Sequence, residues 1–123
     1  MTAVLVSCGG TDFSGTWRGP VSLAYACANG SRIDSMGGVE WTIAQTGNTL
    51  TITPDGGCPS IVADVVGSTA ELRATNCGGG AAVEGGKATL ESPTSLRISL
   101  QDAFPSTGGA CSGQTTGTLT RAP

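Results

Sequence analysis

The chain contains no histidine, a single lysine and five arginines among its 123 residues. Without imidazole, neither a Ser–His–Asp triad nor an ordinary histidine base is available for catalysis. The basic residues are scattered along the chain, whereas nucleic-acid-binding proteins gather Lys and Arg against phosphates. The sequence therefore predicts neither a triad hydrolase nor a protein that binds nucleic acid.

Large side chains are scarce as well. Five residues are aromatic, 12% are charged, 20 are glycine, and the formal net charge is −3. The apolar runs are all far shorter than the length needed to cross a bilayer. A chain of this length forms one domain, and this composition supplies little material for its core.

The remaining residues with catalytic potential are placed unfavourably. Lys87, the only amine for a Ser–Lys dyad, follows Gly85-Gly86 in an expected bulge or turn, where an amine stays solvated. The glutamates that a glycosidase would need fall on polar strand faces or at turns: Glu71, Glu84 and Glu91. We therefore predict a non-enzymatic protein with no catalytic residues, no metal site and no cofactor.

Asp64 interrupts the stretch Ile61–Val66, which is otherwise apolar on both strand faces. We interpret it as an outward carboxylate that pairs with Arg73 on the next strand, in preference to a functional buried acid.

Four of the five cysteines, Cys27, Cys58, Cys77 and Cys111, are widely dispersed, and none belongs to a C-x-x-C pair. A zinc site typically uses closely spaced Cys or His pairs, so two disulfides in an oxidising compartment are the favoured interpretation. The alternative is four buried thiols in a cytosolic protein.

Leu5-Val6-Ser7-Cys8 resembles the lipobox of bacterial lipoproteins, and the fifth cysteine lies in it. The resemblance implies that Cys8 is acylated and anchors the protein to a membrane, and Gly9 resembles the residue that follows the cysteine in lipoproteins of the outer membrane. We therefore expect residues 1–12 to be a signal-peptide remnant, lipidation site and tether, and residues 13–123 a single domain in the bacterial envelope. The alternative is an ordinary first strand with a spare cysteine.

Apolar residues recur with period two and are separated by Gly, Asn, Asp and Pro turns, which predicts about eight short strands. Leu96, Ile98 and Leu100 illustrate the pattern. Residues 58–66 and 69–77 are each expected to form one strand. Residues 28–38 and 104–110 are expected to be loops. Residues 77–92 are interpreted as one strand with a glycine bulge, although Glu84–Lys87 is also compatible with a hairpin turn.

Short connections predict an antiparallel meander, and eight strands favour an up-and-down barrel, with a two-sheet β-sandwich as the alternative. In the meander, the four downstream cysteines fall at the same end of the strands. Strand adjacency then predicts the disulfides Cys58–Cys77 and Cys27–Cys111, provided that Glu84–Lys87 is not a hairpin.

Phe13-Ser14-Gly15-Thr16-Trp17 and the stretch from Trp41 to Leu50, WTIAQTGNTL, resemble small lipocalin-like lipoproteins of bacteria. In that family a G-x-W near the start plugs one end of a β-barrel, which implies the same structural role for Trp17. Tyr25-Ala26-Cys27-Ala28-Asn29-Gly30 is similar to the Y-x-C-x-x-G opening of periplasmic lysozyme inhibitors, but the S-A-S-G stretch of their inhibitory loop has no counterpart here.

Three functions follow as hypotheses. The first is a non-catalytic outer-membrane lipoprotein that binds another macromolecule. The second is a carrier of a small apolar ligand inside the barrel, which needs a cavity of several hundred Å³. The third is an inhibitor of a foreign hydrolase such as lysozyme, with a projecting loop at residues 28–38 or 104–110. We expect a monomer, because the Gly-, Thr- and Ser-rich surface offers no apolar interface patch.

Overall fold

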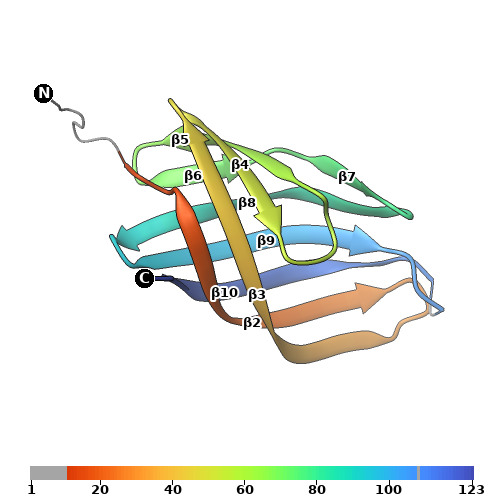
Figure 1. Ribbon diagram of the computed structural model, residues 1–123. Coiled ribbons are helices and arrows are strands. Elements are labelled where there is room, and N and C mark those ends of the chain that lie inside the picture. Colours follow the sequence, from red (N-terminus) through yellow and green to blue (C-terminus); the bar gives the residue numbers. More distant parts are fainter. Residues whose placement is uncertain (1–10, 108) are drawn as a thin grey trace, which may run out of the picture.

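The computed structural model describes residues 11–107 and 109–123, which form an all-β fold of antiparallel strands (Figure 1). In chain order the strands are β2 Gly15–Cys27, β3 Arg32–Thr46, β4 Thr49–Pro54, β5 Ile61–Val66, β6 Thr69–Leu72, β7 Thr75–Gly78, β8 Ala81–Ser92, β9 Ser95–Phe104 and β10 Cys111–Arg121.

Eight of these strands close into a ring. The order β6-β5-β4-β3-β2-β10-β9-β8 is a single sheet, and β6 also pairs with β8 from Thr69↔Thr89 to Leu72↔Gly86. Each pairing is antiparallel. Strands that follow one another in sequence pair, except that β6 pairs with β8 and not with β7, and the pairing of β10 with β2 joins the last strand to the first. This is the predicted up-and-down barrel, and a single closed sheet excludes the two-sheet sandwich.

Strand β8 runs without a hairpin from Ala81 to Ser92, so the bulged strand is confirmed for these residues. The prediction is wrong for the start of residues 77–92, because Cys77 and Gly78 belong to β7 and Gly79-Gly80 form the turn between β7 and β8. Its register against β9 shifts between Val83 and Gly85, which leaves Glu84 as the extra residue. Gly86 has a φ of 147°, and a Cβ there would lie 2.3 Å from the carbonyl oxygen of Ser99. Glycine is therefore required where β8 approaches β9 this closely.

The prediction that residues 28–38 form a loop is wrong for most of this segment. Its second part, from Arg32, belongs to β3 and pairs with β2 from Arg32↔Ala26 onward, so a tight turn of residues 28–31 remains. Strand β4 reaches β3 only at Trp41–Thr46, which leaves this part of β3 as a sheet edge. Edge residues face water on most sides, and Asp34, Ser35 and Met36 are exposed accordingly.

Two other expected strands are shorter than predicted. Strand β5 begins at Ile61, so Cys58 lies in the β4–β5 loop. The stretch from Thr69 to Cys77 is divided by Arg73 and Ala74 into β6, which pairs with β5, and β7, which pairs with β8.

The core consists of a large cluster of buried residues and a smaller one formed by Tyr25, Cys27 and Cys111. Inward residues alternate with exposed ones along β2, β4 and the first part of β9, as period two predicts. The largest fully buried side chains are Phe13, Trp17, Leu50, Ile52, Ile61, Leu96, Ile98, Leu119 and Cys111.

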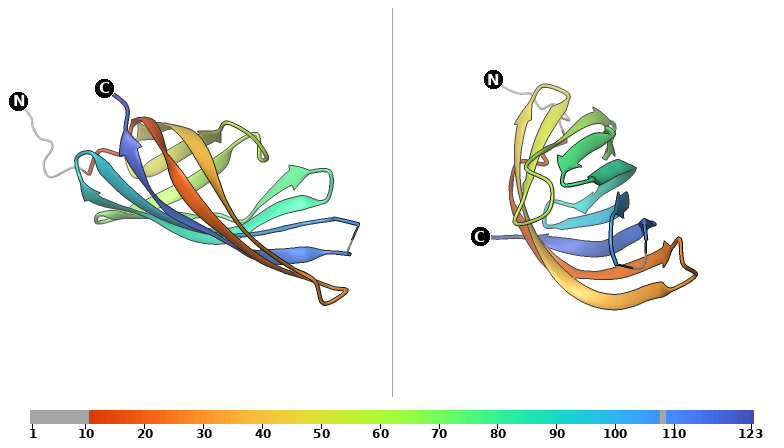
Figure 2. Two further views of the ribbon diagram at one scale, coloured as in Figure 1. Left: turned by 90° about the horizontal axis from the view of Figure 1, so that it is seen from below. Right: turned by 90° about the vertical axis from the view of Figure 1, so that its right-hand side faces the viewer.

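The first described residues enter at one end of the barrel, which we call the packed end. The Thr11 hydroxyl donates to the Gly67 carbonyl over 2.8 Å, and the Gln45 amide donates to the Thr11 carbonyl over 3.0 Å. Figure 2 shows the start of the described chain and the C-terminus at one end of the barrel, with the β2–β3 hairpin extending toward the other end.

Candidate functional site

Trp17 lies at the packed end of the barrel. Its side chain is fully buried, and its Nε1 donates to the Phe13 carbonyl over 2.9 Å. The Arg121 guanidinium stands 4.4 Å from the centroid of the Trp17 ring, a cation–π arrangement. The role of Trp17 as a plug of the barrel stays a prediction.

Arg121 also fastens the chain around this end. It donates to the carbonyls of Asp12 and Pro93, each over 2.8 Å, and to the carbonyl of Ser14. One side chain therefore joins the segment before β2, the β8–β9 turn and the indole ring.

At the opposite end, which we call the mouth, the ring of strands opens. The first part of β3 pairs only with β2, and β7 pairs only with β8, so the strands that close the ring elsewhere separate here. A cavity of about 490 Å³ lies between them. Its apolar lining includes Leu23, Val39, Val83, Leu100 and Phe104.

Three polar side chains meet in the mouth cavity. The Tyr25 hydroxyl lies 3.0 and 2.9 Å from the two carboxylate oxygens of Asp102 and 2.8 Å from the Thr115 hydroxyl. Burial raises the pKa of Asp102 above its ordinary value, and the nearby Glu84 carboxylate adds to that rise, while the Tyr25 hydrogen bond opposes it. Burial likewise raises the pKa of Tyr25. The mouth therefore holds a carboxylate in apolar surroundings.

Both disulfides of the structure stand at the mouth, and they join Cys27 to Cys111 and Cys58 to Cys77, the predicted pairing. Cys27 and Cys111 face each other on β2 and β10 and pack with Tyr25. The other bond differs from the prediction in one respect, because it ties the β4–β5 loop to β7 instead of crossing a strand ladder. Two disulfides indicate an oxidising compartment outside the cytoplasm.

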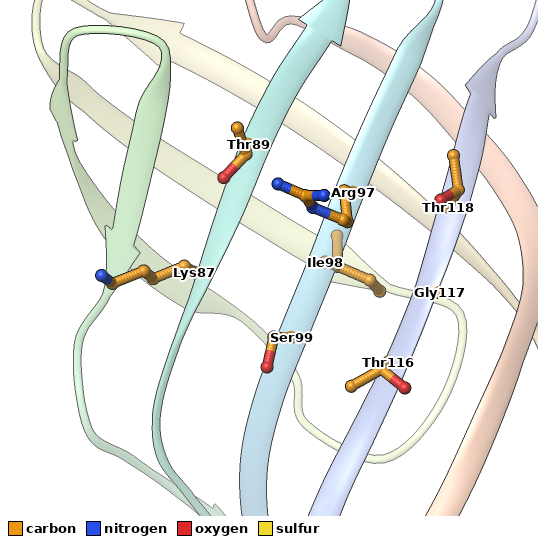
Figure 3. A pocket seen from close by; sticks show the side chains of 8 residues that line it. All are labelled: Lys87, Thr89, Arg97, Ile98, Ser99, Thr116, Gly117 and Thr118. Carbon is orange, nitrogen blue, oxygen red and sulfur yellow. The ribbon is translucent and has the colours of Figure 1, made fainter.

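A second hollow, of about 350 Å³, lies on the outer face of β8, β9 and β10 (Figure 3). Arg97 and Thr89 flank it, Thr116 and Thr118 stand on β10, and Gly117 between them has no side chain to fill it. Arg97 is exposed and forms an ion pair of 3.1 Å with Glu91. This groove lacks enclosing walls and is a weaker candidate than the mouth cavity.

The outward pairing expected for Asp64 is confirmed. Arg73 donates to both carboxylate oxygens of Asp64 over 2.8 and 2.6 Å, and these hydrogen bonds hold the pKa of Asp64 below its ordinary value. Across residues 11–107 and 109–123, no three His, Cys, Asp or Glu side chains are grouped so as to hold a metal ion.

The lipobox Leu5-Val6-Ser7-Cys8 lies outside the described residues, so Cys8 keeps its sequence-based interpretation. In the part of the chain that is described, no helix has the length and apolar character needed to span a membrane. No protein-family model matches the sequence, and no curated protein matches it significantly.

Sequence reasoning did not single out Tyr25 and Asp102 as a site. A signal was present in the alternation of β9, where Leu96, Ile98 and Leu100 face inward. Continuing the same phase by two residues places Asp102 inside the barrel, opposite Gly113 of β10 and Val83 of β8.

Proposed function

We propose that this protein is a non-catalytic binding protein of the bacterial envelope and that the mouth of its barrel takes up a small, largely apolar molecule. The cavity of about 490 Å³ carries this proposal. Its volume falls within the range of ordinary ligand pockets, and a mostly apolar lining with a few convergent polar groups is their usual composition.

The incomplete burial of the lining residues supports the same function. Leu23, Leu100 and Phe104 are half-buried although each faces inward, whereas Leu96 on the same strand as Leu100 is fully buried. Apolar surface left exposed to water inside a barrel is stabilised when a ligand covers it.

The two disulfides support a place in the envelope, and the lipobox supports an anchor at Cys8 in the outer membrane. The contacts of Thr11 with Gly67 and Gln45 lie at the packed end. An anchor attached through this end leaves the mouth facing away from the lipid, where it is open to solutes.

Inhibition of a hydrolase has less support. The segment at residues 28–38 was expected to project as a loop, but most of it is the edge of β3. A tight turn of four residues, 28–31, is a small surface with which to enter an enzyme active site.

Nile red, a neutral apolar dye, tests the cavity. We expect its fluorescence to rise and shift to the blue when it binds the oxidised protein. Ala81 lines the cavity, so Ala81→Phe should fill part of it and weaken dye binding by about tenfold or more, a cost of about 1.4 kcal/mol. Ala44→Phe adds the same ring on the exposed outer face of β3 and should bind dye as the wild type does.

Two results would overturn cavity binding. One is the absence of saturable dye binding by a protein that is folded and has both disulfides. The other is equal dye affinity in Ala81→Phe and Ala44→Phe, which would place the dye on the outer surface.

The anchor is tested by expressing the protein behind a complete lipoprotein signal peptide in a bacterium. We expect mass spectrometry to find a diacylglycerol on Cys8, and Cys8→Ser to abolish both that modification and membrane fractionation. An unmodified Cys8 in an exported, disulfide-bonded protein would refute the anchor without affecting the cavity.

A further inference from the structure

The charge of the mouth cavity restricts which ligands fit it. Asp102 is its one ionisable carboxylate, and the residues that line the cavity include no Lys, Arg or His. The four ion pairs found within the described residues involve Glu40, Asp34, Asp64 and Glu91, and Asp102 takes part in none of them. Glu84, the charged group that acts on Asp102, is itself negative.

Asp102 also keeps free hydrogen-bonding capacity. A carboxylate can accept about four hydrogen bonds, and the single proton of the Tyr25 hydroxyl supplies one of them. The Thr115 hydroxyl can donate to the Tyr25 oxygen and so direct the Tyr25 proton toward Asp102. The carboxylate is thereby oriented, and among the described residues only the Tyr25 side chain donates to it.

Aromatic rings flank the carboxylate. Tyr25 and Phe104 both line the cavity and meet edge to face, with ring centroids 5.0 Å apart. Aromatic faces attract cations, and this attraction is stronger where water is excluded. One cavity is thus lined by a carboxylate, two aromatic rings and the apolar side chains of Leu23 and Leu100, and together these groups complement an ammonium group that carries an apolar body.

We infer that the ligand of the mouth cavity is an amphipathic amine, whose protonated nitrogen donates to Asp102 and whose apolar part lies against Leu23, Val83 and Leu100. This inference rests on the proposed binding function and adds the chemical class of the ligand. The raised pKa of Asp102 is consistent with it, because a bound cation would compensate the carboxylate for its lost hydration.

Three ligands with the same apolar chain test the inference: octylamine, octanol and octanoate, each used below its aggregation concentration. Displacement of Nile red from the oxidised full-length chain at neutral pH gives their relative affinities. We expect octylamine to bind about tenfold more tightly than octanol, the effect of one charge-assisted hydrogen bond, and octanoate to bind most weakly.

Asp102→Asn keeps the size of the side chain and an acceptor for the Tyr25 hydroxyl but removes the charge. We expect this variant to lose the roughly tenfold preference for octylamine over octanol, a ratio of two affinities measured on the same variant. Asp64→Asn removes a carboxylate that lies outside the cavity and should keep the preference.

The outcomes separate the two proposals. Saturable dye binding with equal displacement by all three ligands, or with octanoate preferred, overturns the amine inference and leaves the binding function intact. An amine preference that survives in Asp102→Asn assigns the selectivity to another group and also overturns the inference. Failure of the dye to bind the folded wild type refutes the binding function itself.

Discussion

The two ends of this barrel are stabilised in different ways. At the packed end, Trp17, Leu96 and Leu119 are fully buried, and Arg121 connects the surrounding segments by hydrogen bonds and by its contact with the indole. At the mouth, Leu23 and Leu100 remain half-buried around a cavity, and both disulfides are found there.

The difference shows how a chain with few aromatic residues keeps an open interior. Close packing stabilises a core through burial and dispersion, and a cavity forfeits part of that stabilisation. A disulfide acts mainly by restricting the unfolded chain, so its contribution does not depend on close packing around a cavity. The two disulfides therefore stabilise the end of the barrel where the cavity leaves apolar side chains only half-buried.

Removal of the disulfides should have the largest effect on stability. By the loop-entropy model, Cys27–Cys111, with a sequence separation of 84, contributes about 4–5 kcal/mol, and Cys58–Cys77, with a separation of 19, contributes about 3 kcal/mol. We expect both paired substitutions to lower the free energy of unfolding measured by urea denaturation. The loss should be larger for Cys27→Ala/Cys111→Ala than for Cys58→Ala/Cys77→Ala.

The same variants test whether the disulfides act on the mouth. Hydrogen exchange should rise first in the ends of β2 and β10 without Cys27–Cys111, and in β7 and the β4–β5 loop without Cys58–Cys77. If hydrogen exchange in these variants rose as much at the packed end as at the mouth, the disulfides would not act on the mouth specifically.

Two leucines of β9 give a direct comparison of packing. Leu96 is fully buried at the packed end, and Leu100 is half-buried beside the cavity. Leu96→Ala should create a new cavity and reduce the free energy of unfolding by about 2–5 kcal/mol, as for other buried leucines. Leu100→Ala should cost about 1 kcal/mol, because its side chain already borders empty space.

Urea denaturation of both variants measures this comparison, and Nile red affinity complements it. Leu100→Ala should weaken dye binding, whereas Leu96→Ala should not while the protein remains folded. If both substitutions cost the same free energy, the mouth is as tightly packed as the opposite end and the cavity has no structural consequence.

Much of the fold could be predicted from the period-two pattern and the turns. Alternation in Val39–Ile43 and Leu96–Leu100 identifies inward faces without knowledge of the partners, because each strand buries one face. The short turns at Gly47-Asn48 and Gly67-Ser68 make neighbouring strands pair, and closure of the barrel then places Cys27 beside Cys111. The sequence also predicts the pairing of Cys58 with Cys77, although this bond links the β4–β5 loop to β7 and not two paired strands.

The mouth was harder to predict, because its features depend on where strands lose their partners. Arg32–Gly38 carries polar residues and glycines and is typical of a loop, yet it pairs along β2 as an edge. The chain leaves strand conformation at Arg73 and Ala74, so that β6 pairs with β5 whereas β7 does not. No local sequence pattern marks this break. A cavity between such edges is a property of the closed sheet, so it is visible only in three dimensions.

The smallest effect concerns the charge in the mouth. The folded-state pKa of Asp102 is raised above 3.8, so between these two values the folded protein binds more protons than the unfolded chain. The free energy of unfolding then falls as pH rises through this window, and it stays lower above the folded-state pKa. Asp102→Asn should remove this loss and be more stable than the wild type at pH 7, by at most about 1 kcal/mol since solvent screens a half-buried charge.

Urea denaturation from pH 3 to pH 8 gives the free energies of unfolding of the wild type and of Asp102→Asn. Their difference measures the contribution of the Asp102 charge. Tyr25 contributes nothing to this difference, because its raised pKa lies far above this range. A variant less stable than the wild type at pH 7 would mean that the ionised carboxylate stabilises the mouth by itself. A gain in stability on removing the charge would instead identify Asp102 as a group whose presence serves binding at the expense of folding, as expected of a ligand site.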